Sequence, residues 1–221
     1  MQLRSYHYNY SMPELQHIFA TPLFSTTISM PDWDETIYTW KENKHNRIST
    51  QQNVLDMPEL AALRRTIDAS VRVFWRDFMC ATCQAELSIQ QSWVNITDTG
   101  AQHHRHWHTN SMYSGVLFWC DHSAPITFIN PRYPQLDFTV GTTHESNSGV
   151  WQVEPKLGKL LIFPSWLEHQ VETNHSGGER ISLSFNTWPV GQLTADPTRA
   201  LNMYTRTEPQ KLTDWRDSKT K

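Results

Sequence analysis

The sequence lacks any long uninterrupted run of apolar residues. Its first residues, MQLRSYHYNYSMPEL, contain no apolar core of the length that a signal peptide needs, and no later run approaches the length that crosses a bilayer. Internal repeats are also missing. We therefore expect a soluble, cytoplasmic protein that does not act on a membrane.

Cysteine is scarce and odd in number. Cys80, Cys83 and Cys120 are the three cysteines of the chain, which suits a reducing compartment and argues against a disulfide framework. The Cys80-x-x-Cys83 spacing could be half of a zinc or redox site. Because no second cysteine pair and no thioredoxin-like strand pattern accompany it, we interpret these residues as plain thiols near a helix end.

An excess of positive charge is also missing. The formal net charge is −3, so the chain has no overall basic footprint and nucleic-acid binding is not favoured. Charged residues make up 19% and aromatic residues 12% of the 221 positions, which is typical of a packed globular protein rather than a disordered one. This length can bury a full core in a single domain without disulfides.

The first third of the chain is expected to contribute helices. Residues 19–30 are typical of a short strand ended by Pro31, and residues 31–45 of a short helix with that proline in its first turn. Residues 56–80 predict an amphipathic helix that starts with a capping box formed by Asp56 and Glu59. Its apolar stripe recurs at steps of three or four: Leu60, Leu63, Ile67, Val71, Phe74 and Phe78.

The pattern then changes to short strands separated by Gly, Pro, Asn and Ser turns. The expected strands are LSIQQSWVNI, HWHTNSMYSGVLFWC, APITFIN, VWQVEP, KLLIFPSW, HQVET and RISLSFNTW. This order favours helices packed on an antiparallel β-sandwich or barrel. Residues 131–149 lack periodicity and are expected to form a mobile loop or a lid over the barrel mouth. We predict one domain over residues 1–189, with helices in about 31–82 and the β core in about 85–188, followed by a polar tail over 190–221 that could contain a short helix.

Four of the eleven histidines crowd into the segment AQHHRHWHTNSMYSG, residues 101–115. Side chains alternate along an extended strand, so His104, His106 and His108 are expected on one face and His103 on the other. Two imidazoles that lie two positions apart on one face can share a metal ion. The pair alone is weak evidence, because a polar loop rich in histidine would have the same sequence.

A second group of polar residues follows in GKLLIFPSWLEHQVETNHSGGERISLSFN, residues 158–186. His169 begins an extended segment, and Arg180, Ser182, Ser184 and Asn186 then alternate with Ile181, Leu183 and Phe185. If the apolar face of this strand meets the helix stripe, Arg180 and Ser182 must face the barrel interior. A buried guanidinium there requires an anion.

The order of these residues resembles that of the double-stranded β-helix dioxygenases that use Fe(II) and 2-oxoglutarate. One branch of this superfamily, the 2-oxoglutarate-Fe(II) oxygenases of marine bacteria and phages, has similar sequence segments. The segments that carry this resemblance are SWVN, HWHTNSMYSGV, VEPKLGKLLIFPSWLEHQV and RISLSFN. The resemblance covers about residues 85–187 and implies a jelly-roll or cupin-like barrel with helices outside one sheet. If a phage encodes the chain, the implied location is the host cytoplasm.

The resemblance also implies a site. His106 matches the first iron ligand, His169 the distal ligand, and Arg180 with Ser182 the pair that holds the distal carboxylate of 2-oxoglutarate. The usual second ligand is Asp or Glu, and here His108 stands in that place. We therefore predict His106, His108 and His169 as metal ligands and catalytic residues, and Arg180, Ser182, Asn95 and Tyr113 as the cosubstrate site, with Fe(II), 2-oxoglutarate and O2 as cofactors.

Several of these residues also have a purely structural interpretation. We expect His103 and His104 to be solvated loop residues, and Trp107 and Trp166 to be core or rim aromatics rather than substrate clamps. Asn95 and Tyr113 could bind the cosubstrate or satisfy buried backbone groups. Glu168 could pair with Arg180, but alternation from His169 places it on the opposite face.

Three functions stay open from the sequence. The favoured one is a 2-oxoglutarate-dependent hydroxylase that releases succinate and CO2. The others are a cupin-type enzyme whose three histidines hold a metal without a 2-oxo acid, as in thiol dioxygenases, and a jelly-roll binding or structural protein without catalysis. The substrate, a small molecule or a peptide side chain, is not named by the sequence, and a homodimer is left open.

Overall fold

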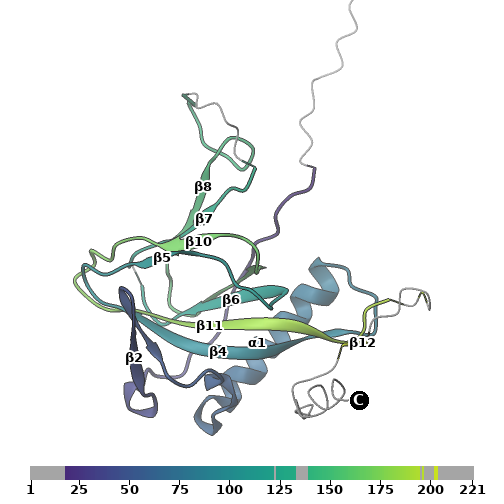
Figure 1. The fold of residues 1–221 in the computed structure, drawn as a ribbon, viewed down its shortest axis with the longest axis horizontal. Coiled ribbons are helices and arrows are strands. Elements are labelled where there is room, and N and C mark those ends of the chain that lie inside the picture. Colours follow the sequence, from purple (N-terminus) through teal and green to yellow (C-terminus); the bar gives the residue numbers. More distant parts are fainter. Residues whose placement is uncertain (1–17, 122, 133–138, 195, 197–201, 204–221) are drawn as a thin grey trace, which may run out of the picture.

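A computed structural model describes residues 18–121, 123–132, 139–194, 196 and 202–203. The elements form two antiparallel sheets, which Figure 1 shows as two layers with the β7–β8 hairpin extending away from the body.

The larger sheet has the order β1-β9-β6-β11-β4-β3-β2, with β12 added to β11, and the smaller has the order β5-β10-β7-β8. The strands of the larger sheet are β1 (Phe24–Thr27), β2 (Trp40–Asn43), β3 (Asn46–Ser49), β4 (Glu86–Thr97), β6 (Tyr113–Phe118), β9 (Lys159–Pro164), β11 (Arg180–Gln192) and β12 (Asn202–Met203). Those of the smaller sheet are β5 (His103–His106), β7 (Ile126–Ile129), β8 (Val150–Val153) and β10 (His169–Val171).

The centre of the larger sheet is the long pairing of β11 with β4. The register runs from Arg180 opposite Thr97 to Val190 opposite Glu86, with one bulge between Asn186 and Thr187. Ile181, Leu183 and Phe185 point from β11 into the same core as the apolar stripe of helix α1 (Ala61–Val73). The expected contact between this strand face and the helix is therefore confirmed, and the polar face of β11 turns toward the smaller sheet.

A second, smaller core lies between the two sheets. It consists of Val116, Phe118, Ile126, Phe128, Leu161, Phe163 and Leu167, which come from β6, β7, β9 and the turn after β9. This cluster fills the space next to β7. The polar faces of β4 and β11 remain on the other side of the interior, beside β5 and β10.

Two of the helix predictions are wrong in detail. The expected helix over residues 31–45 is instead a short 3-10 turn, η1 (Glu35–Ile37), followed by strand β2. The segment Thr36 to Trp40 is rich in β-branched and aromatic side chains, and Lys44 takes a left-handed conformation (φ 56°) that reverses the chain into β3. These features favour a hairpin over a helix.

The long helix was predicted correctly, but its start and end differ. Two 3-10 turns, η2 (Val54–Asp56) and η3 (Pro58–Leu60), precede α1, whose N-cap Leu60 makes no side-chain capping bond. Asp56 pairs with Arg64 instead of forming a capping box. At the other end, the π-turn η4 (Phe74–Phe78) rotates the stripe, so that Phe78 is 66% exposed while the rest of the predicted stripe is buried.

The boundary expected at residue 189 falls inside a strand. β11 continues to Gln192 and pairs there with β12. The rest of the predicted tail, including any short helix, lies outside the described residues. Cys80 and Cys83 are free thiols just after η4, as expected.

In the part of the chain that the structure describes, no helix is long and apolar enough to cross a membrane.

Gly115 provides a test of the packing inside the larger sheet. A Cβ atom at this position would lie 2.0 Å from the ring of Phe185 on the adjacent strand. We expect Gly115→Ala to destabilise the protein by roughly 1 to 3 kcal/mol, because the buried ring must move to accept the methyl group. Urea denaturation measures this change. Gly178→Ala is the matched control, since no atom lies within 4 Å of its added Cβ, and equal stabilities of the two variants would contradict the packing.

Candidate metal centre

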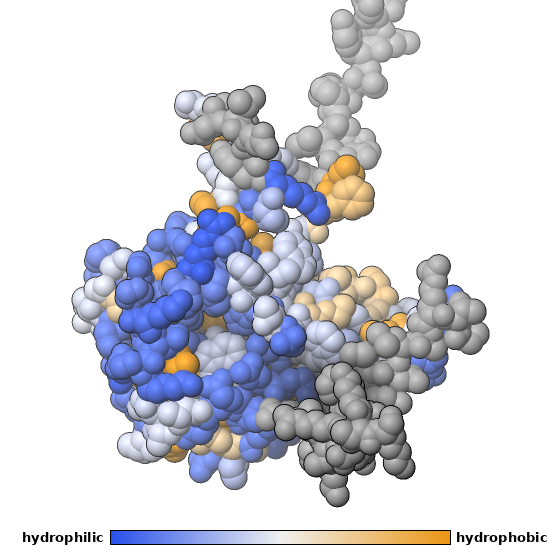
Figure 2. Space-filling model, viewed as in Figure 1, coloured by the Kyte–Doolittle hydropathy of each residue, from blue (hydrophilic) through white to orange (hydrophobic). Residues whose placement is uncertain are grey.

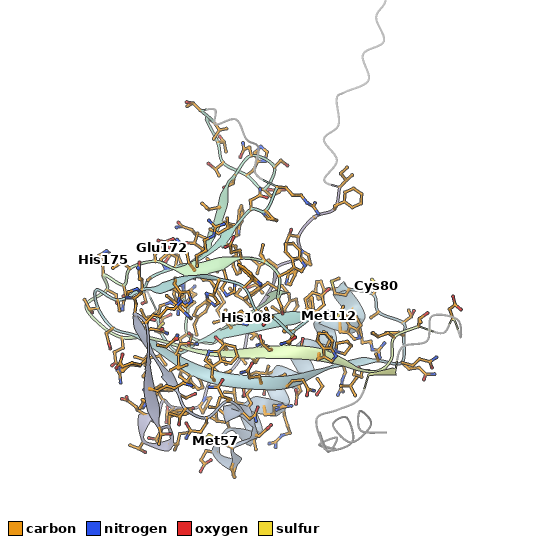
Figure 3. All side chains as sticks on the ribbon, viewed as in Figure 1. Met57, Cys80, His108, Met112, Glu172 and His175 are labelled. Carbon is orange, nitrogen blue, oxygen red and sulfur yellow. The ribbon has the colours of Figure 1, made fainter. Side chains whose placement is uncertain are left out.

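Three histidines from different parts of the chain converge between the two sheets. His106 ends β5 and lies directly opposite His169 of β10 in the register, and His108 follows two residues after β5. One ring nitrogen of each histidine lies within 4.8 Å of those of the other two. Figure 3 shows His108 in the space between the sheets. This spacing allows one metal ion to contact all three imidazoles.

The second ring nitrogen of each histidine is already engaged. Nδ1 of His106 lies 2.7 Å from the carbonyl oxygen of His104, and Nδ1 of His169 lies 2.9 Å from that of Leu167. Nδ1 of His108 lies 2.6 Å from the side-chain oxygen of Asn186. All three partners accept hydrogen bonds, so each Nδ1 carries the proton and each Nε2 keeps a free lone pair. Such outer partners are the usual means of fixing a metal-binding tautomer.

The same three rings are held in the neutral form. Burial lowers the pKa of His106 to about 4 and lowers the pKa of His108. The pKa of His169 is lowered well below the usual value, mainly by burial and then by the neighbouring His106 and His108. Neutral imidazole is the form that binds metal, so the site is ready for a cation at neutral pH.

A chain of side-chain amides supports His108. The oxygen of Asn186 that faces His108 also accepts a bond of 2.8 Å from the hydroxyl of Ser114. The amide nitrogen of Asn186 donates to Gln91 (3.1 Å), and the amide nitrogen of Gln91 donates to Gln52 (2.9 Å). Each link fixes the orientation of the next amide. Ser114, Gln91 and Gln52 are not predicted from the sequence, although alternation places Asn186 on the same face as Arg180.

His103 does not lie in solvent, contrary to the expectation for this residue. The pairing of β5 with β10 contains an irregularity between His169 and Val171, where three steps along β5 match two along β10. This bulge brings His103 to the same side as His106, and the two rings stack with centroids 4.5 Å apart. Burial lowers the pKa of His103 to about 3. His104 is also half-buried and belongs to β5, so it is not a solvated loop residue either, and burial lowers its pKa.

His103, His104 and His106 form a second group whose ring nitrogens lie within 4.8 Å of one another. For His103 and His104, no hydrogen bond in the described structure fixes a ring tautomer. The group of His106, His108 and His169 has all three tautomers fixed, and it is therefore the better candidate for a metal site.

Arg180 lies on the same interior face and is 2% exposed. Its Nε donates to the carbonyl oxygen of Ala124 (2.9 Å), its Nη1 donates to the hydroxyl of Ser182 (3.2 Å), and its guanidinium lies 5.1 Å from the centre of the Phe118 ring. Its Nη2 is buried and has no hydrogen-bond partner among the described residues. Burial lowers the pKa of Arg180 to about 10.

No carboxylate of the described residues pairs with Arg180. Glu168 points outward and pairs with Arg105, as strict alternation from His169 predicts. The guanidinium therefore stays a buried cation with an unsatisfied donor, which is the environment that an anionic ligand would complete.

The two other residues predicted for the cosubstrate site have different outcomes. Asn95 is buried on the interior face, where it accepts a bond from Trp93 (3.2 Å) and donates to Ser184 (3.0 Å). Tyr113 lies on the opposite face of β6, in the core under α1, with its ring 4.8 Å from that of Phe74. The prediction for Tyr113 is wrong, because its side chain packs in the apolar core, while its even-numbered neighbours on β6, Ser114 and Val116, face the smaller sheet.

A cavity of about 300 Å³ opens onto the histidines. Its lining is Asn43, Ile48, Gln52, Gln91, Trp93, Asn95, His103, His106, Trp107, His108, Thr109 and Asn186. These residues include no Asp, Glu, Lys or Arg, so the described wall is polar but uncharged apart from any bound ion. Trp107 is 57% exposed at the rim, whereas Trp166, 53% exposed, is not part of this wall; neither tryptophan is a core residue.

A larger cavity of about 630 Å³ lies elsewhere, between residues 18–23 and the β7–β8 hairpin. Its walls include the exposed side chains of Phe19 and Trp151, and Figure 2 shows apolar side chains gathered beside the projecting hairpin. Of the described residues of the 131–149 loop, Pro131, Arg132, Glu145, Ser146 and Ser148 line this cavity and none lines the one at the histidines. They therefore do not form the expected lid, while residues 133–138 lie outside the described part.

Comparisons with known proteins agree with this geometry. Residues 91–186 match the family model described as "Putative 2OG-Fe(II) oxygenase", a segment that contains every histidine of the candidate centre and Arg180. A comparison with curated proteins finds no significant sequence match. The structure is similar to an oxidoreductase of the 2OG-Fe(II) oxygenase family from Burkholderia pseudomallei, with 13% identity, a TM-score of 0.51, and coverage of 69% of this chain and 73% of that one.

The structure is also similar to HygX from Streptomyces hygroscopicus, solved with nickel, 2-oxoglutarate and hygromycin B bound. The identity is 9% and the TM-score is 0.51, over 76% of this chain and 82% of HygX. At these identities the likeness concerns the fold, and it confirms the predicted jelly-roll class with a helix outside one sheet.

Metal titration distinguishes the two histidine groups. We expect His108→Ala and His169→Ala to lose the binding of one equivalent of Fe(II) or Ni(II), because each removes one of three Nε2 donors. His104→Ala should keep it, since His104 supports His106 through its backbone carbonyl. Full occupancy at unchanged affinity in His108→Ala would exclude His108 as a ligand.

Asn186 allows a test of the outer partners. Asn186→Ala should weaken metal binding by roughly 10-fold to 100-fold, because the His108 ring loses the acceptor that fixes its tautomer. Asn186→Asp keeps an acceptor and should keep the affinity. Isothermal calorimetry with Ni(II) measures both, and equal affinity in the alanine variant and the wild type would show that Asn186 has no such role.

Proposed function

We propose that the chain is an Fe(II)- and 2-oxoglutarate-dependent dioxygenase that hydroxylates its substrate and releases succinate and CO2. The observation that carries the proposal is the combination of three free Nε2 lone pairs with a nearby buried guanidinium that lacks an anion. The family match over residues 91–186 supports it.

His106, His108 and His169 would hold the metal. Their tautomers and neutral state suit a divalent cation, and three nitrogen donors leave further positions open on one side of an ion. Fe(II) bound there, together with 2-oxoglutarate and O2, would supply the oxidising power for the hydroxylation. The role of the protein is to keep three rings at fixed angles without adding negative charge.

Arg180 and Ser182 would bind the distal carboxylate of 2-oxoglutarate. The guanidinium is held in place by Ala124 and by Ser182, whose hydroxyl accepts one bond from Arg180 and keeps its own proton to donate. The buried position of Arg180 excludes water, so a carboxylate there would meet a strong, dry donor group. Asn95, on the same face, would support the cosubstrate from the neighbouring strand.

The uncharged cavity wall would receive the substrate. Its volume of about 300 Å³ suits a small molecule or one side chain of a peptide. We infer that the chain acts in the cytoplasm on such a substrate, without nucleic acid or membrane as a partner.

Arg180 also separates this function from the alternatives. A cupin-type enzyme that binds its metal through three histidines does not require a buried guanidinium with an unpartnered donor. A jelly-roll binding protein without catalysis does not require three histidines with fixed tautomers. Both alternatives would leave the cost of burying Arg180 unexplained.

The proposal is tested by cosubstrate binding and turnover. Under anaerobic conditions with Fe(II), we expect Arg180→Ala to weaken 2-oxoglutarate binding roughly 30-fold or more, since a charge-assisted contact with a buried cation is lost. Metal stoichiometry should not change. With O2, the wild type should form succinate from 2-oxoglutarate, faster when a substrate is present.

Arg72→Ala is the control, because Arg72 is exposed on α1 and far from the site in the sequence. Equal 2-oxoglutarate affinity in the wild type and Arg180→Ala would favour the cupin-type alternative. Absence of both binding and succinate formation in metal-loaded wild type would overturn the proposal.

A further inference from the structure

Two buried polar atoms at one end of the β4–β11 pair have no hydrogen-bond partner among the described residues. They are Nη2 of Arg180 and the hydroxyl oxygen of Thr97; a third such atom, Nδ2 of Asn46, lies on the neighbouring strand β3. Thr97 is 0% exposed and Arg180 is 2% exposed. Such atoms are uncommon in folded proteins, and two together indicate a missing polar ligand.

Both side chains belong to the same face of the sheet. Arg180 lies directly opposite Thr97 in the antiparallel register, and Ser182 lies directly opposite Asn95, two residues along. Directly opposed residues project on the same side of a sheet, with Cβ atoms about 5 Å apart. The threonine hydroxyl and the guanidinium therefore flank the same interior space.

Two of the donors of Arg180 are already used. Of its five N–H groups, one on Nε donates to the carbonyl of Ala124 and one on Nη1 donates to the hydroxyl of Ser182, while Nη2 has no partner among the described residues. The thiol of Cys120 does not neutralise the cation, because burial raises its pKa and keeps it protonated. An incoming carboxylate has two oxygens, and here two separate donors are available.

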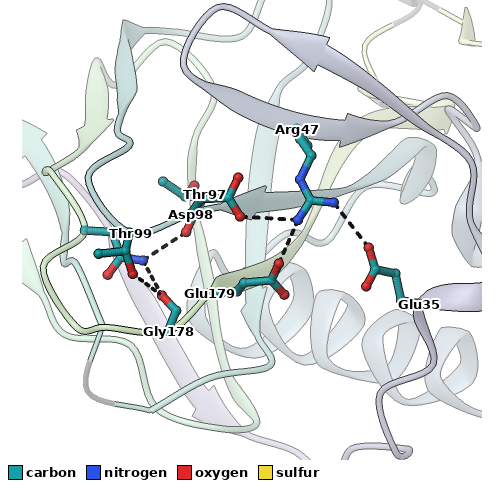
Figure 4. Close-up of polar contacts among 8 residues, drawn as sticks. Glu35, Arg47, Thr97, Asp98, Thr99, Gly178 and Glu179 are labelled. Atoms are coloured by element: carbon teal, nitrogen blue, oxygen red, sulfur yellow. Dashed lines mark hydrogen bonds and ion pairs between the residues drawn. The ribbon is translucent and has the colours of Figure 1, made fainter.

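The backbone around both residues is held by polar contacts. Arg47 on β3 pairs with Asp98, the residue after Thr97, at 3.2 Å and with Glu179, the residue before Arg180, at 2.7 Å. Asn174 donates to the carbonyl oxygen of Thr97 at 2.9 Å. Figure 4 shows this arrangement, in which the ends of both strands are tied to Arg47. The two free donors are thus kept at a fixed separation.

We propose that the Thr97 hydroxyl is a direct ligand of the distal carboxylate of the 2-oxo acid, on the side opposite to Ser182. The inference rests on the proposed function and adds a binding residue from β4 to those from β11. The Thr97 hydroxyl has no hydrogen-bond partner when the ligand is absent, and it donates a hydrogen bond to the carboxylate when the ligand is bound. Thr97 therefore contributes to ligand affinity and not to the stability of the ligand-free fold.

The test uses the isosteric variant Thr97→Val and two ligands. In anaerobic calorimetry of the Fe(II)-loaded protein, Thr97→Val should weaken 2-oxoglutarate binding roughly tenfold or more, as expected for a lost bond to a charged group. Binding of 2-oxobutyrate, which keeps the 2-oxo acid but lacks the distal carboxylate, should not change. Thr97→Ser should restore the affinity for 2-oxoglutarate.

Thermal unfolding gives an independent measurement. The ligand-free Thr97→Val protein should melt at or above the wild-type temperature, because the variant removes a buried hydroxyl that has no partner. The matched control is Thr187→Val on β11, whose hydroxyl is equally buried but donates to the carbonyl of Tyr113 at 2.8 Å. That control should lower the melting temperature and leave 2-oxoglutarate affinity unchanged.

The outcomes separate the two proposals. If the wild type binds 2-oxoglutarate and Thr97→Val binds it equally well, the role of Thr97 is refuted while the proposed function stands. An equal loss of affinity for 2-oxobutyrate would also refute it, since the effect would not depend on the distal carboxylate. If the metal-loaded wild type does not bind 2-oxoglutarate, the proposed function fails and the role of Thr97 fails with it.

Discussion

The antiparallel pairing of β11 with β4 is the constraint on which the rest of the structure depends. One face of this pair carries Leu183 and Phe185 into the core under α1, and the other carries Arg180, Ser182 and Asn186 toward the histidines. A slip of the register by one residue would exchange the two faces and bury the polar set against the helix. The apolar core therefore determines the position of the site: burial of the helix stripe fixes the orientation of every polar side chain on β11.

Elements with a strong period could be predicted from the sequence. The clean alternation from Arg180 to Asn186 predicted both the buried arginine and the core face, and the spacing of Leu63, Ile67 and Val71 predicted α1. Histidine spacing and the resemblance to a known family predict His106, His108 and His169 as one group, and the structure brings their ring nitrogens together. In each case the prediction depended on a local pattern that continues through the whole element.

The predictions failed where the period is interrupted. The bulge in β5 turns His103 inward, away from the position that strict alternation predicts. The helix predicted over residues 31–45 from the position of Pro31 is also wrong, because the left-handed Lys44 and the pairing with β3 favour a hairpin. The amide chain from Gln52 to His108 could not be found either, because glutamines that are distant in sequence meet only through the strand order.

The charge balance of the site follows from the histidine at position 108. Three neutral imidazoles leave a bound divalent ion with its full charge, and Arg180 adds a second cation that no described carboxylate neutralises. A dianion that spans the two would lower the energy of both, since each buried charge is costly without a counterion. Binding of the metal and of the dianion should therefore be strongly coupled, and thermodynamic linkage requires that each raises the affinity of the other by the same factor. In a site with a carboxylate ligand, the protein supplies part of this compensation. Under the proposed function, the ligand would supply it here, and the selection of a doubly charged 2-oxo acid would then follow from the absence of an acidic residue at position 108.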